Sequence, residues 1–172
     1  MASRKRPVGL AVLVVVVLGV AALGVNYLRC GSWSGCDANG LPLGAVSYQF
    51  VSSRSPAHLD YPKARKLTTR GTSESRDPLE GVTNSASAGA VLVTADTPTQ
   101  VYAWYRERLL AEKWTPYPVA PFSTQLTAQG YKRGIREYFV VGIDDPKQLS
   151  DVRGIPTGGT VLEYTYTIAA RH

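Results

Sequence analysis

The longest apolar run of the chain lies near its N-terminus. Residues 8–25 read VGLAVLVVVVLGVAALGV, without a charged or strongly polar side chain, and Asn26, Tyr27 and Leu28 continue the run. As a helix, about 18 to 21 residues span about 27–32 Å, which is the thickness of the hydrocarbon core of a bilayer. The pattern predicts a transmembrane anchor over residues 8–28, embedded in the lipid bilayer.

The charges beside this run predict its orientation. Residues 1–7 carry Arg4, Lys5 and Arg6, whereas only Arg29 follows closely. Basic residues stay on the cytoplasmic side, so residues 1–7 are expected to be a cytoplasmic basic segment. A cleaved secretory signal remains an alternative, and so does lipidation of Cys30, although the residue before a lipidated cysteine should be small. Each alternative places residues 30–172 outside the cytoplasm, and the preferred one is a single-pass protein of the cell membrane.

Two cysteines follow the apolar run. Cys30 and Cys36 bracket five residues in a Gly- and Ser-rich segment, residues 29–46, which is typical of a stalk. Disulfides persist in extracytoplasmic compartments, so these cysteines are predicted to form one. A redox dithiol would more typically have two intervening residues, and a metal site would need further ligands nearby.

The clearest local unit lies in the middle of the chain. Residues 90–94, AVLVT, are typical of a strand. Thr97 and Gln100 have the spacing of a capping box, with Pro98 at the first helical position. The helix should run to about Lys113.

The helix carries one apolar stripe, because Val101, Tyr105 and Leu109 recur every four residues. Trp104 lies beside this stripe. The far side of the helix carries Arg106, Glu107 and Glu112.

Further strands are expected before and after this unit. Residues 135–143 and 161–168 show the alternation of half-buried strands, and residues 48–51 and 59–67 are weaker candidates. Residues 68–89 are rich in Thr, Ser, Gly and charged side chains, which predicts an exposed loop, flexible over 70–88. Residues 47–172 are therefore expected to form an extracytoplasmic α+β domain: a small, mostly antiparallel sheet covered by one principal α-helix.

The charge balance argues against a nucleic-acid partner. The chain has 172 residues and a formal net charge of +6, from 19 Lys and Arg against 13 Asp and Glu. Three of these cations lie in residues 1–7, so the rest of the chain carries a net charge of only +3. Nucleic-acid-binding domains usually gather many more basic residues on one face.

No motif of catalysis, cofactor binding or metal binding stands out. The chain has no P-loop, GxGxxG, GxSxG or HExxH motif. His58 and Asp60 could form a base and its orienting group, but a surface turn explains them as well. Asp144 and Asp145 precede a proline, which is typical of a turn. His172 ends the chain. Catalytic residues, metal ligands and cofactors are therefore all expected to be absent.

Two groups of side chains are candidates for a contact surface. Lys132, Arg133 and Arg136 form a small basic cluster that could touch anionic lipid or a wall polymer, although a solvated hairpin end is the simpler explanation. Trp104 and Tyr105 are the aromatic candidates, although core packing also explains them.

One stretch resembles a known pattern. Residues 61–64 read YPKA, residues 94–106 read TADTPTQVYAWYR, and Lys113-Trp114 follow. The stretch resembles bacterial membrane-anchored or secreted proteins that carry a YPGA-like turn and a TxD[ST]PxxVxx[FW]YRxxL…W helix. The match covers roughly residues 60–115, with Lys63 where the pattern has Gly. The resemblance implies this strand–helix unit and no activity.

The sequence therefore favours a non-enzymatic domain that contacts another envelope protein or a surface polymer. The alternative is a small module that binds an apolar ligand or lipid in a pocket between the helix and the sheet. A cavity between Trp104, Tyr105 and the Tyr164/Tyr166 face would support that alternative, and a filled core would count against it. An enzyme is the third hypothesis, and it would require a perturbed carboxyl or histidine in a cleft.

Overall fold

A computed structural model describes residues 30, 34–77, 82–149, 152–153, 155 and 158–171. The described residues divide into two compact units, with the boundary between Ala45 and Val46. None of their helices is long and apolar enough to cross a bilayer. The predicted cytoplasmic segment, residues 1–7, and the predicted anchor, residues 8–28, lie outside the described residues.

The first unit contains the disulfide. Cys30 and Cys36 are bonded, which confirms the pairing expected from their position. The chain then turns tightly: the Asp37 carboxylate accepts from the N–H groups of Asn39 (2.9 Å) and Leu41 (3.0 Å). Gly40 has a φ of +71°, a left-handed conformation that glycine adopts without steric cost.

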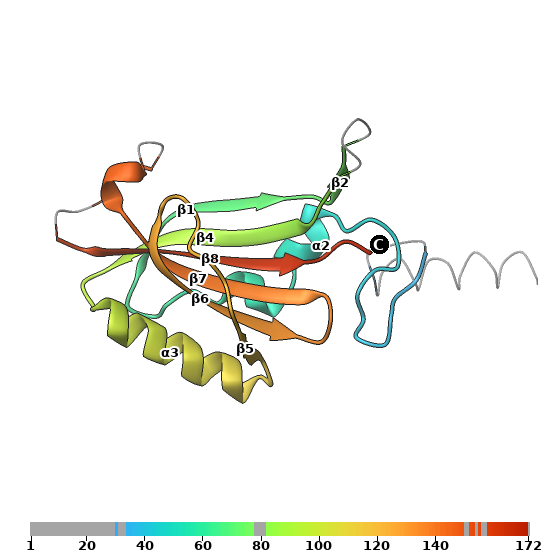
Figure 1. The fold of residues 1–172 in the computed structure, drawn as a ribbon, viewed down its shortest axis with the longest axis horizontal. Coiled ribbons are helices and arrows are strands. Elements are labelled where there is room, and N and C mark those ends of the chain that lie inside the picture. The colour runs from blue at the N-terminus through green and yellow to red at the C-terminus, as the bar shows by residue number, and fades with distance from the viewer. Residues whose placement is uncertain are drawn as a thin grey trace, which may run out of the picture. The chain divides into compact units, whose positions relative to one another are not determined.

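The second unit is built on an antiparallel sheet of six strands (Figure 1), in the order β1-β4-β8-β7-β6-β5. A separate two-stranded hairpin pairs β2 with β3. The strands are β1 (Arg65–Thr72), β2 (Ser75–Arg76), β3 (Thr83–Asn84), β4 (Ala86–Thr94), β5 (Thr115–Tyr117), β6 (Gln125–Arg133), β7 (Glu137–Asp144) and β8 (Thr160–Ile168). The expected α+β class and antiparallel sheet are confirmed.

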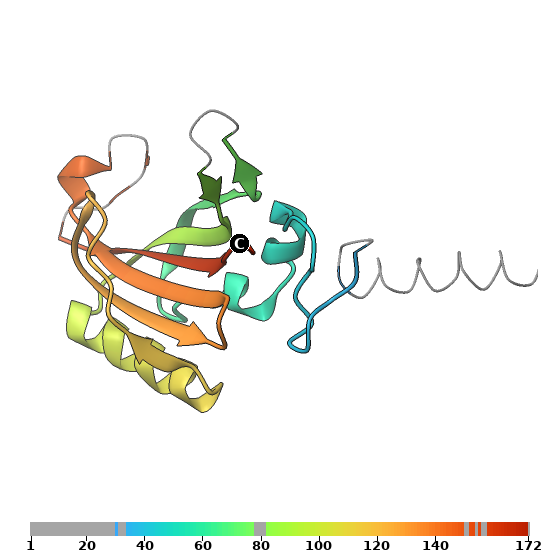
Figure 2. The same cartoon turned by 45° about the vertical axis from the view of Figure 1, so that its right-hand side comes forward.

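One principal helix, α3 (Pro98–Ala111), lies across one face of this sheet (Figure 2). Its predicted capping box is present: the Gln100 N–H donates to Thr97 Oγ1, and the Thr97 N–H donates to Gln100 Oε1. The buried residues of the helix are the three of the predicted stripe, Val101, Tyr105 and Leu109. The helix expected from the sequence is therefore confirmed in position and in its buried face.

Shorter helices share that face. They are α2 (Tyr48–Ser52) and the 3-10 turn η1 (Ser55–His58), whereas a second 3-10 turn, η2 (Pro146–Gln148), follows β7. The Tyr164 hydroxyl of β8 donates to the Ala57 carbonyl in η1, and the Tyr105 hydroxyl of α3 donates to the Leu59 carbonyl just after η1. Both bonds join the segment after α2 to the aromatic side of the sheet.

The N-terminal part of this unit corrects three predictions. Residues 48–51 form a helix rather than a strand, because Ser47 caps it and the Val51 side chain is fully buried. The strand expected over 59–67 begins only at Arg65. The loop expected over 68–89 instead contains most of β1, the β2–β3 hairpin and the start of β4, while residues 78–81 lie outside the described residues. Polar side chains are tolerated there because β1 is an edge strand.

Strands β5 and β6 were not predicted at all. The expectation of a strand over residues 135–143 is also shifted, because Ile135 is 83% exposed in the β6–β7 turn and β7 begins at Glu137. Strand β6 has the sequence QLTAQGYKR, which contains few apolar residues and no apolar alternation. Its place in the sheet depends on pairing with β7 rather than on its own pattern.

Candidate functional site

The aromatic core is filled by its own rings. Tyr105 lies 4.8 Å from Trp104 and 6.3 Å from Tyr164 between ring centroids, and Phe139 stacks on Tyr164 at 5.6 Å. Tyr105, Tyr164 and Phe139 are fully buried. Tyr105 is therefore part of the core rather than the contact surface expected for it, whereas Trp104 is half-buried at its margin.

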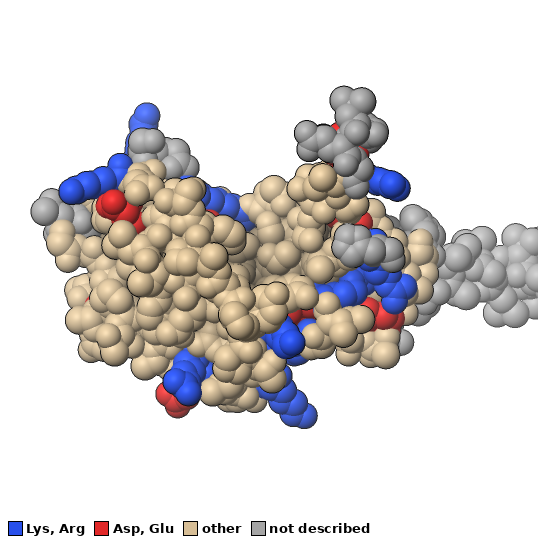
Figure 3. Space-filling model, viewed as in Figure 1, with Lys and Arg blue, Asp and Glu red and all other residues tan. Residues whose placement is uncertain are grey.

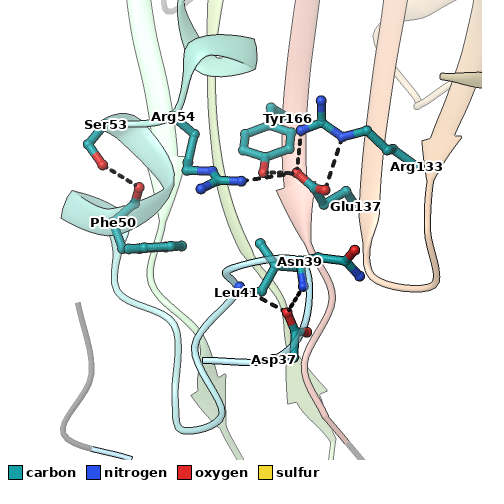
Figure 4. Close-up of polar contacts among 9 residues, drawn as sticks. All are labelled: Asp37, Asn39, Leu41, Phe50, Ser53, Arg54, Arg133, Glu137 and Tyr166. Atoms are coloured by element: carbon teal, nitrogen blue, oxygen red, sulfur yellow. Dashed lines mark hydrogen bonds and ion pairs between the residues drawn. The ribbon is translucent and has the colours of Figure 1, made fainter. Parts of the chain in front are cut away.

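A buried ionic network lies on the same face of the sheet (Figure 4). The Glu137 carboxylate accepts two bonds from Arg133, at 2.7 and 3.1 Å, and one from the Tyr166 hydroxyl at 2.6 Å. Arg54 lies 3.9 Å from the same carboxylate. Burial and the Glu137 charge both raise the pKa of Tyr166, while the hydrogen bond to Glu137 raises the pKa of Arg133. The network joins β6, β7 and β8 to the segment after α2, and every oxygen-bearing group in it has a partner within the fold.

The three residues of the predicted basic cluster have different surroundings in the structure. Arg133 pairs with Glu137 and lies 4.6 Å from the Trp114 ring centroid. Arg136 is buried and donates to the Ala169 carbonyl. Only Lys132 is exposed, with its ammonium 5.6 Å from the Tyr117 ring centroid. Figure 3 shows Lys and Arg scattered over the visible face rather than gathered in one patch.

The other polar candidates have structural partners. The Asp60 carboxylate accepts from the Tyr164 hydroxyl at 2.7 Å and from Lys66 at 2.7 Å, and it makes no bond to the exposed His58 among the described contacts. Asp145 caps η2 by accepting from the Lys147 N–H, which fits the turn expected there. His172 lies outside the described residues.

Asp144 is a buried carboxyl on the opposite face of the sheet. It is 1% exposed, its Oδ2 has no hydrogen-bond partner among the described residues, and its Oδ1 lies 3.5 Å from the Thr124 hydroxyl. Burial and the nearby charge of Glu163 raise the pKa of Asp144 to about 7. The group lines none of the three surface hollows that are described, so it has no access to a substrate through them.

One hollow runs between α3 and the outer edge of β6. One part, of about 530 Å³, is lined by Arg106 of α3, by residues 116–119, and by residues 128–131 of β6. The adjoining part, of about 330 Å³, is lined by Thr99, Tyr102 and Ala103 of α3, and again by Arg106 and Gln129. Since the two parts share Arg106 and Gln129, they form one groove, here called the β6 groove.

The β6 groove exists because β5 is short. Strand β5 pairs with β6 over only three residues, from Thr115 opposite Lys132 to Tyr117 opposite Gly130. Pro118 follows, and proline cannot donate a hydrogen bond to a ladder. Residues 118–124 then leave the ladder and return to the start of β6 as a long loop (Figures 1 and 2). Among the strands that the structure describes, none therefore pairs with residues 125–129 of β6 on this side.

Several large exposed apolar side chains lie on the elements that form the groove, and one of them, Tyr117, lines it. Seven such residues are exposed among the described ones, and four of them belong to α3, β5, β6 or the loop that joins β5 to β6. These four are Leu110, Tyr117, Phe122 and Leu126. Sequence reasoning missed this site because it rests on an unpredicted strand; the three prolines at 116, 118 and 121 were its only local signal.

Comparisons with protein-family models, with curated proteins and with solved structures find no match for this chain. The described residues contain no group of three or more His, Cys, Asp or Glu side chains placed to hold a metal ion. The function must therefore be argued from the geometry of the chain itself.

Proposed function

We propose that this chain is a single-pass membrane-anchored protein whose extracytoplasmic domain binds another protein of the cell envelope. The bilayer would be engaged by residues 8–28, and the binding surface would be the β6 groove. This places the protein among interaction modules rather than enzymes.

The proposed location rests on two features. The apolar run over residues 8–28 follows three cations, which is the pattern of an anchor with a cytoplasmic N-terminus. The Cys30–Cys36 disulfide is compatible with an oxidising compartment immediately beyond that anchor.

The observation that carries the binding role is the open edge of β6. An unpaired strand edge is a ready template for another chain, and native proteins usually protect such edges with charges, prolines or bulges. The opposite edge of the sheet is protected in this way, because β1 carries Arg65, Lys66 and Arg70 and has an irregular register. Residues 125–129, QLTAQ, carry no charge and no proline, although the register is irregular at their first residues.

The alternative, a module for a small apolar ligand or lipid, has less support. It needs a cavity between α3 and the Tyr164/Tyr166 face, and that space is filled by packed rings. The β6 groove is open and contains a guanidinium and amide groups, which suits a polar chain better than a lipid tail.

Site-specific photo-cross-linking in native membranes tests the proposal. A benzophenone amino acid placed at Leu126, which is 62% exposed and lies two residues before the groove-lining Ala128 on β6, should capture one defined protein. The matched control is the same amino acid at Ile135, which is also apolar and 83% exposed but lies in the turn at the other end of β6. Equal capture at both positions, or none at Leu126, would contradict the proposal.

A further inference from the structure

We infer that the partner enters the β6 groove as an extended peptide, adds a strand to β6, and places a carboxylate side chain against Arg106. The inference rests on the proposed function and specifies the partner's chemistry. The main chain of the peptide would supply affinity through ladder hydrogen bonds, and the carboxylate would supply selectivity.

The backbone of β6 is oriented for this addition. Residues of an antiparallel ladder alternately direct their N–H and C=O groups to one side and to the other. The Lys132 carbonyl points toward β5, because it accepts from the Thr115 hydroxyl at 3.2 Å. Pro116 lies opposite Tyr131 and has no N–H to donate. No bond is lost there, because by this alternation the backbone groups of Tyr131 point away from β5. The backbone N–H and C=O groups of Lys132 and Gly130 therefore point toward β5. Ala128 lies two residues further along β6, beyond the end of β5, and its N–H and C=O point to the open edge.

The walls of the groove suit an extended chain. One wall is a stripe of α3 in which Thr99, Ala103 and Arg106 recur at helical spacing. The other is the departing segment, where Pro118 and Val119 face β6 without pairing to it. A strand between these walls would continue the line of β5, with alternate side chains directed toward α3 and away from it.

The positive charge of Arg106 favours a partner with an acidic side chain. Arg106 lines both parts of the groove and makes no hydrogen bond or ion pair with any described residue. No acidic side chain lines the groove in the part of the chain that the structure describes. An incoming carboxylate would therefore meet an unpaired guanidinium, for which it is the preferred planar partner. A second copy of this chain is disfavoured, since pairing two β6 edges would add a second unpaired cation to the same region.

Peptide selection gives the first test. Random linear peptides displayed on phage are selected against the full chain in mild detergent. We expect enriched peptides with an acidic residue, whose affinity falls about tenfold when Arg106→Glu reverses the charge. Changing that acidic residue to Lys should restore binding to the Arg106→Glu protein. Arg108→Glu is the matched control, because Arg108 already pairs with Glu112 and lines neither part of the groove.

A scan of the selected peptide by backbone N-methylation tests strand addition without altering the protein. Methylation should weaken binding about tenfold at every second residue and little at the residues between, because only alternate N–H groups enter the ladder. An evenly distributed effect, no enriched peptide, or affinity indifferent to Arg106→Glu would overturn the inference. So would a dimer of the full chain that Ala128→Pro abolishes.

The two proposals can fail separately. If Leu126 still cross-links one protein but Arg106→Glu leaves that capture unchanged, the interaction role stands and the acidic-strand partner is wrong. If cross-linking at Leu126 finds no protein, the interaction role itself is refuted.

Discussion

Replacing Asp144 with Asn should remove a decrease in the free energy of unfolding that the wild-type domain shows as the pH rises. The carboxyl is 1% exposed, and burial together with the Glu163 charge raises its pKa to about 7, from an ordinary value of 3.8. The folded state therefore holds a proton that the unfolded state releases, and stability falls as the pH rises from about 4 to about 7. Above pH 7 the loss approaches about 4 kcal/mol, because each tenfold change in proton affinity corresponds to about 1.36 kcal/mol.

The Asp144→Asn protein keeps a side chain of the same shape and has no charge to bury. At pH 8 it should be more stable than the wild type by up to about 4 kcal/mol, and near pH 4 the two should agree to within about 1 kcal/mol. Urea unfolding followed by near-ultraviolet circular dichroism at pH 4 to 9 measures this difference. Asp145→Asn, at the neighbouring turn carboxylate, should retain the wild-type slope. Parallel curves for wild type and Asp144→Asn would refute the reasoning.

Three further substitutions test the packing of the domain by thermal or urea unfolding. Glu137→Gln should cost about 1.5–3 kcal/mol, because it leaves the Arg133 guanidinium, which is 30% exposed, without its anionic partner; a loss below about 1 kcal/mol would show that water solvates the pair. Thr97→Ala removes the cap of α3 and should lower the free energy of unfolding by about 1 kcal/mol. An unchanged unfolding midpoint would mean that the capping bond does not stabilise the fold. Gly89→Ala would place a methyl group against the Tyr164 carbonyl of the neighbouring strand and should cost more than about 2 kcal/mol; wild-type stability would show that β4 can shift without strain.

The elements that were predicted correctly are those whose signals are local. The capping box of Thr97 and Gln100, the stripe of Val101, Tyr105 and Leu109, and the alternation of β8 all act over a few residues. The disulfide also followed from local spacing and from its position after the apolar run. Such signals can be read from one chain because their physical causes lie within one turn of helix or one strand.

The misassigned elements depend on partners far away in the chain. Strand β1 has a polar sequence, and it is a strand because its backbone pairs with β4. Residues 48–51 have apolar and aromatic side chains that fit a strand, but the Ser47 cap and the burial of Val51 stabilise a helix.

The β6 groove could not have been derived from the residues that line it. Arg106 was expected on the far side of α3, and the sequence shows only that it lacks the acidic residue at i+4 that Arg108 has in Glu112. The prolines after β5 indicate that the strand must end, but only the pairing of β6 with β7 shows which backbone this ending leaves open. Local hydrogen bonding and side-chain period specify elements, whereas the exposure of an edge is a property of the assembled sheet.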